Sequence, residues 1–113
     1  MFGLPKSTID LLRDYFLKIP EIEKVVIYGS RAKGNYEKGS DIDFAFFSRS
    51  EEDLTGKLLM ELDELPTPYL FNVTNYYKLK HLELKEHIDR VGIVFYETIS
   101  RKHVGPVSQT GLL

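Results

Sequence analysis

The sequence predicts a single small α/β domain, of the mixed α+β kind, in which a short mixed sheet packs with helices. Stretches with helical spacing of apolar residues alternate along the chain with short runs rich in β-branched and aromatic residues. The chain has 113 residues, which is enough for one modest core and too few for two. Its composition, 42% hydrophobic and 28% charged, is that of an ordinary folded protein.

Composition also narrows the function classes. The formal net charge of −2 gives no overall attraction to nucleic acid, so a nucleic-acid partner is not expected. The chain has no Cys, which excludes disulfides, thiolate nucleophiles and thiolate metal sites. It contains no apolar run of about 18 residues and no signal-peptide pattern at its N-terminus, so we expect a cytoplasmic protein without a membrane contact.

Seven elements are expected, in the order helix, strand, strand, helix, strand, helix, strand. Ser50 and Asp53 resemble a capping box at the start of the second helix, and Gly92 is placed as the C′ residue of the third. The expected helices are 7–20, 50–66 and 81–92, and the expected strands are 24–30, 40–48, 68–77 and 93–97. Residues 1–97 form the predicted domain. Residues 98–113 show no apolar period, and we expect them to be a tail that is flexible or contacts a partner.

Two carboxylates stand at the start of a strand that is otherwise apolar. Asp41 and Asp43 are two residues apart, so both side chains leave the same face of the strand, about 6–7 Å apart at Cα. Mg²⁺ favours one or two carboxylates together with waters and phosphate oxygens. An isolated pair of this kind is more often a solvated rim, and that interpretation stays open when the pair is considered alone.

A glycine-serine turn lies ten residues before the acid pair. Gly29 and Ser30 end an apolar strand, where a glycine lets a ligand approach the backbone and a hydroxyl can bind phosphate. The following residues, "SRAKG", can begin a helical turn whose N–H groups face an anion, and Arg31 and Lys33 add positive charge. Alone, this stretch is also compatible with an ordinary turn carrying basic surface residues.

Taken together, the turn and the acid pair form the pattern Gly29-Ser30, ten residues, Asp41-Ile42-Asp43. This pattern resembles the G-S-x10-D-x-D signature of the DNA polymerase beta nucleotidyltransferase superfamily, and "GSRAKG…GSDID" is similar to its minimal nucleotidyltransferases, or MNT domains. The resemblance implies that Gly29 and Ser30 hold nucleotide phosphates and that Asp41 and Asp43 bind Mg²⁺, in a site that holds two metal ions in the intact family.

The resemblance extends to the antitoxin half of MNT–HEPN toxin–antitoxin pairs. These proteins transfer AMP from ATP to a tyrosine of the partner toxin, which implies ATP and a HEPN-type protein as partners. Aromatic pairs such as Tyr76-Tyr77 and Phe95-Tyr96 favour an oligomer or a complex with another chain. A transferase acting on nucleic acid is disfavoured by the acidic balance and by the lack of a second domain to hold a primer.

One position departs from the family pattern. The third acid of the metal site is expected in the strand "PYLFNVTNYY", where the aligned residue is Asn72 and no acid occurs. An amide oxygen can still touch a metal, but a neutral amide attracts Mg²⁺ less and cannot accept a proton at neutral pH. The sequence therefore predicts an impaired nucleotidyltransferase, natural or altered by substitution, and leaves open a binding module that neutralises its partner by contact.

Overall fold

The computed structural model describes residues 1–98 of the chain. Four α-helices, one 3₁₀ helix and four strands occur in these residues. Their order and bounds are α1 (Lys6–Leu17), β1 (Ile22–Tyr28), α2 (Ser30–Lys33), β2 (Ile42–Ser48), α3 (Thr55–Asp63), β3 (Phe71–Asn75), the 3₁₀ helix η1 (Tyr76–Lys78), α4 (Leu82–Val91) and β4 (Ile93–Glu97). The predicted tail lies outside the described residues, except for Thr98.

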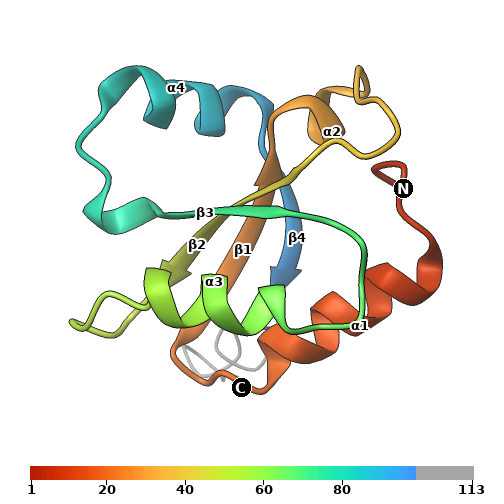
Figure 1. The fold of residues 1–113 in the computed structure, drawn as a ribbon. Coiled ribbons are helices and arrows are strands. Elements are labelled where there is room, and N and C mark those ends of the chain that lie inside the picture. The colour runs from red at the N-terminus through yellow and green to blue at the C-terminus, as the bar shows by residue number, and fades with distance from the viewer. Residues whose placement is uncertain (99–113) are drawn as a thin grey trace, which may run out of the picture.

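The strands form one mixed sheet in the order β3-β2-β1-β4 (Figure 1). β1 is antiparallel to both of its neighbours, β2 and β4, whereas β2 and β3 are parallel. The last residue of β1 and the first residues of β2, β3 and β4 therefore meet at one end of the sheet. The predicted fold class, a short mixed sheet packed with helices, is confirmed.

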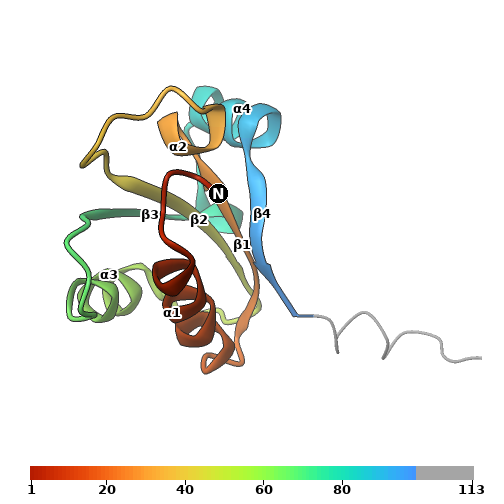
Figure 2. The same cartoon turned by 90° about the vertical axis from the view of Figure 1, so that its right-hand side faces the viewer.

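Helices cover both faces of the sheet, as the side view shows (Figure 2). On one face, α1 and α3 share the main core with the sheet, in which Phe16, Leu58 and Phe44 are almost completely buried. On the other face, α4 packs Ile88 against a smaller cluster that contains Ala45. Strand alternation explains the division, because Phe44 and its i±2 neighbours point one way and Ala45 points the other. No helix within residues 1–98 is long and apolar enough to cross a membrane.

The second predicted helix begins later than expected, because the capping box does not form. α3 starts at Thr55, and Asp53 instead accepts hydrogen bonds from the backbone N–H and the hydroxyl of Thr55 (3.0 and 2.6 Å). Ser50 accepts one from the N–H of Glu52 (3.1 Å). Short side chains that bond the backbone two residues ahead stabilise turns in place of a helical start.

Gly92 follows α4, but for a different reason from the one predicted. Its backbone is extended (φ −66°, ψ 143°) rather than left-handed, so it is not a C′ glycine. A Cβ at this position would collide with the Val26 side chain and the Ile88 carbonyl. The missing side chain lets the chain pass directly from α4 into β4.

Candidate nucleotide and metal site

The candidate site lies at the end of the sheet where β1 ends and the other strands begin. The strand register places Tyr28, Asp43 and Asn72 side by side across β1, β2 and β3. Asp41, two residues before Asp43, leaves the same face of the chain. The structure thus brings the predicted acid pair together with the asparagine at the expected position of the third acid.

The side chain of Asn72 lies between the two carboxylates. Its Nδ2 donates to Oδ1 of Asp43 at 2.8 Å and to Oδ2 of Asp41 at 3.2 Å. Asp43 is half-buried, while Asp41 and Asn72 are exposed to solvent. The two acids are therefore held together by amide hydrogens within the chain itself.

The glycine-serine turn is in contact with the acid pair. Gly29 has φ 75° and ψ −154°, a conformation that is essentially restricted to glycine. A Cβ built on Gly29 would collide with Oδ2 of Asp43. Ser30 is the first residue of α2, so the predicted helical turn after the glycine is present. The turn and the acid pair, ten residues apart in sequence, form one site in space.

Arg31 takes a different place from the one expected for a phosphate ligand. It is only 3% exposed, and its guanidinium donates to the carbonyls of Ser40 (Nε 3.0 Å, Nη2 2.8 Å) and Phe2 (Nη1 2.8 Å). The rings of Tyr36 and Tyr69 flank it, with centroids 5.4 and 5.1 Å from its Cζ. Arg31 thus stabilises the loop that leads into Asp41, through hydrogen bonds to backbone carbonyls.

Lys33, the other predicted cation, is exposed at the end of α2. It differs from Arg31 in that its side chain is free to reach a ligand from the solvent side. From sequence alone, both residues are predicted to bind phosphate because both follow the glycine-serine turn. Burial separates them: Arg31 holds the loop, and Lys33 is the cation that stays a candidate for phosphate.

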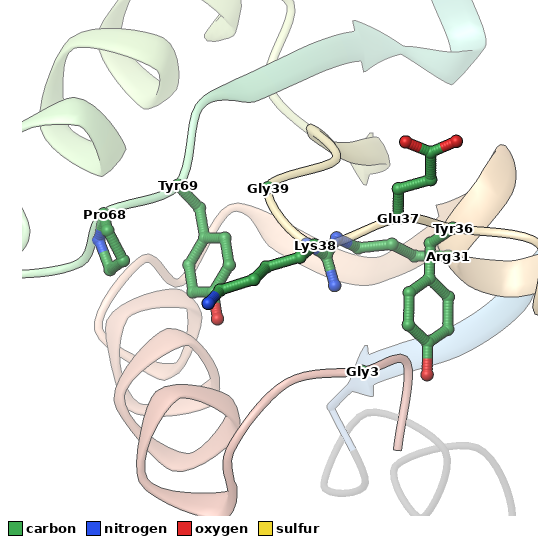
Figure 3. A pocket seen from close by; sticks show the side chains of 8 residues that line it. All are labelled: Gly3, Arg31, Tyr36, Glu37, Lys38, Gly39, Pro68 and Tyr69. Atoms are coloured by element: carbon green, nitrogen blue, oxygen red, sulfur yellow. The ribbon is translucent and has the colours of Figure 1, made fainter.

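A cavity of about 530 Å³ adjoins the loop on the side of the N-terminal segment (Figure 3). Of the predicted site residues, Arg31 lines it, whereas the glycine, the serine, the two acids and Asn72 do not. Tyr69, like Phe71 two residues later, belongs to the side of β3 that packs toward α1 and α3. The cavity is therefore separate from the acid pair. Its lining residues are Gly3, Arg31, Tyr36, Glu37, Lys38, Gly39, Pro68 and Tyr69.

Tyr28 lies opposite Asp43 in the strand register, at the end of β1. It is 7% exposed, and its hydroxyl lies 3.1 Å from Oγ1 of Thr74 in β3. Burial raises the pKa of Tyr28, and the nearby Asp43 carboxylate adds to the rise. His87 of α4 packs edge-on against Tyr28, with ring centroids 6.0 Å apart. The buried phenol stays protonated at neutral pH, and its ring packs in the smaller cluster of the sheet.

The donor set fits Mg²⁺ through its two carboxylates. Within the described residues, no group of three or more His, Cys, Asp and Glu side chains gathers in a way that could hold a metal ion. Asp41 and Asp43 supply the hard oxygen ligands that Mg²⁺ prefers, and one or two carboxylates suffice when phosphate oxygens complete the shell. The third side chain, Asn72, presents N–H rather than oxygen to the pair.

A glycine-serine turn packed against paired acids at one end of a small mixed sheet is the arrangement of the nucleotidyltransferase class. The comparison with family models agrees, since the model of "Polymerase beta, Nucleotidyltransferase" matches residues 10–101. The chain belongs to this family. The comparison with curated proteins gives no match.

Several solved structures with the same fold are of toxin–antitoxin complexes. A toxin–antitoxin structure with AMP-PNP is 23% identical, with a TM-score of 0.57 over 88% of this chain and 77% of that one. A mutant of the pair MntA-HpeT is 23% identical, with a TM-score of 0.57 over 90% of this chain and 80% of that one. A complex of tri-AMPylated Shewanella oneidensis HEPN toxin with MNT antitoxin is 18% identical, with a TM-score of 0.50 over 85% of this chain and 78% of that one. At these identities the likeness concerns the fold.

Proposed function

We propose that the protein is an MNT-type antitoxin of the cytoplasm that binds Mg-ATP and transfers AMP to a tyrosine of a HEPN toxin, with weakened chemistry. The observation that carries the proposal is the contact between Gly29 and Asp43, which unites the turn and the acid pair in one site. Family membership supports the reaction class. The AMP-PNP and tri-AMPylated toxin named for the similar structures support the nucleotide and the acceptor.

In this proposal each predicted residue has a distinct role. Gly29 and Ser30 receive the triphosphate, because Gly29 carries no side chain and the first N–H groups of α2 have no acceptor within the helix. Lys33 neutralises phosphate charge from the solvent side. Asp41 and Asp43 hold Mg²⁺, which when bound supplies neutralisation of the charge that develops on the phosphates. We assign Arg31 to positioning of the loop instead of to the nucleotide.

The proposed reaction joins the phenolic oxygen of the acceptor tyrosine to the α-phosphorus of ATP. The bond between the α-phosphorus and the oxygen that bridges it to the β-phosphorus breaks, and pyrophosphate leaves with that oxygen. The phenol gives its proton to solvent water, because Asn72 cannot accept it at neutral pH. Because a positioned general base is commonly worth about 10²–10⁴-fold in rate, we expect slow transfer by this chain.

The second candidate is a binding module that neutralises the partner by contact. The bridging amide of Asn72 favours it, since both acids already have a hydrogen-bond donor within the chain. Under this alternative the protein forms the complex with its partner, and nucleotide binding is residual. The two candidates differ in whether label from ATP reaches the partner.

The experiment follows AMP incorporation from labelled ATP into a HEPN-type candidate partner protein, at saturating Mg-ATP. Parent protein is compared with Asn72→Asp and with the double variant Asp41→Asn/Asp43→Asn. We expect a slow rate for the parent, a rate higher by roughly 10²-fold for Asn72→Asp, and none for the double variant.

Complex formation is measured in parallel, by gel filtration of the two proteins. A stable complex with no label on the partner for either the parent or Asn72→Asp would reject the transferase and support the binding module. Equal and substantial rates for the two proteins would show that another group does the work of the third acid. Full activity of the double variant would reject the acid pair as the metal site.

A further inference from the structure

The orientation of the Asn72 amide is fixed by what surrounds it. Both neighbouring groups are carboxylates, which only accept hydrogen bonds when ionised. With Nδ2 toward them, the amide donates one hydrogen to each acid. The flipped amide would set Oδ1 against two acceptor oxygens and lose both hydrogen bonds. The network therefore selects the orientation in which the amide hydrogens lie between the acids.

We propose that Asn72 is a built-in substitute for the metal ion, which holds the acid pair together in the metal-free protein and competes with a divalent cation for it. Two carboxylates this close repel each other, and a positive group between them lowers that repulsion. The amide hydrogens supply a partial positive charge at the place a cation would take. A cation must displace the amide before it can bind both acids.

This proposal rests on the metal site of the proposed function, although not on AMP transfer. It gives Asn72 an effect opposite to that of an ordinary ligand. If the amide oxygen were a metal ligand, removing it would weaken metal binding. If the amide hydrogens compete with the metal, removing them strengthens it. The affinity for metal should therefore rise when the side chain is replaced by one that neither donates nor coordinates.

The test measures binding of Mn²⁺ or Mg²⁺ alone by calorimetry, without nucleotide or partner protein. Asn72→Leu keeps the approximate shape of the side chain and removes its polar atoms, and Asn72→Ala removes the whole amide. Asn72 is exposed, so neither substitution disturbs the core. Asn35→Ala, in the exposed loop between the turn and the acids, is the matched control.

We expect both Asn72 variants to bind the metal about fivefold more tightly than the parent, the order of effect of one net hydrogen bond. The control should bind like the parent. Without metal, Asn72→Leu should melt at a lower temperature than the parent, because the acids then repel without a donor between them. In an Asp43→Asn background, where the repulsion is absent, the same substitution should no longer lower the melting temperature.

Metal affinity that is unchanged or weaker in both Asn72 variants would overturn the proposal, since the amide would then be a spectator or a ligand. The absence of metal binding in the parent and in both variants would overturn it as well, because the freed acids must form a cation site. Neither result depends on AMP transfer, so this inference and the proposed reaction can fail separately.

Discussion

Gly29→Ala is the change that most directly tests the contact between the turn and the acid pair. Two costs are expected. The backbone at Gly29 has φ 75° and ψ −154°, which an alanine adopts only with strain. The new Cβ would also meet the Asp43 carboxylate, which must shift to make room. That shift breaks or lengthens the 2.8 Å hydrogen bond from Asn72 to Asp43.

The two costs add to a large fraction of the stability of a small domain. Backbone strain in this region is worth about 1–3 kcal/mol, and one lost hydrogen bond about 1 kcal/mol. We therefore expect the free energy of unfolding to fall by about 2–4 kcal/mol and the melting temperature by roughly 10–20 °C. Because the carboxylate is displaced, affinity for Mn²⁺ should also fall.

Chemical denaturation of four variants, Gly29→Ala, Gly34→Ala, Asp43→Ala and the double variant of Gly29 and Asp43, separates the strain from the collision. Gly34→Ala is a control for strain without collision, since Gly34 has φ 89° and ψ 1° with no atom within 4 Å of its Cβ position, and about 1–2 kcal/mol is expected there. In an Asp43→Ala background, where the collision and the hydrogen bond are both absent, Gly29→Ala should cost about 1 kcal/mol less than it does in the parent. The reasoning is refuted if Gly29→Ala costs no more than Gly34→Ala and costs the same in both backgrounds.

Three further predictions concern single side chains. Ser30→Ala should weaken Mg-ATP binding by about 0.5–1.5 kcal/mol in calorimetry, and unchanged affinity would remove the hydroxyl from the phosphate site. Arg31→Lys should lower the free energy of unfolding by about 2–3 kcal/mol, because an ammonium cannot replace the guanidinium fork. At temperatures below the melting range, the affinity for Mg-ATP should stay near that of the parent. Unchanged stability with weakened Mg-ATP binding would make Arg31 a phosphate ligand. Burial raises the pKa of Tyr28, so the folded protein keeps a proton that the unfolded chain loses near pH 10, and stability falls as pH rises above about 10. Tyr28→Phe should reduce that fall, and an identical pH profile would contradict the buried phenol.

The division of the sheet into two faces could be predicted from the sequence. Alternation in β2 puts Phe44 and Asp43 on opposite faces of the strand, and in the structure Phe44 lies in the main core while Asp43 bonds Asn72. The register between strands could not be predicted in the same way. It depends on which strands pair, and the row of Tyr28, Asp43 and Asn72 exists only once β1, β2 and β3 are side by side.

The burial of Arg31 had no signal in the sequence. A basic residue beside a glycine-serine turn predicts a phosphate ligand, but the guanidinium of Arg31 is buried. Its actual acceptors are backbone carbonyls of Ser40 and Phe2, and every residue carries such an acceptor whatever its side chain. A partner of that kind can be found only when the loop and the N-terminal segment are placed in space.

In this site, a substitution at position 72 can remove the third acid without disturbing the fold. Asn72 is exposed, so an acid or an amide at this position changes the charge beside the acid pair without changing the core. Gly29 is different, because its backbone conformation and its contact with Asp43 join the turn to the sheet. A chain of this family can therefore carry an amide at the position of the third acid and keep the geometry of the turn and the acid pair, whereas a side chain at Gly29 would disturb both together. This asymmetry explains how an intact turn and acid pair can occur beside an asparagine that cannot act as a base.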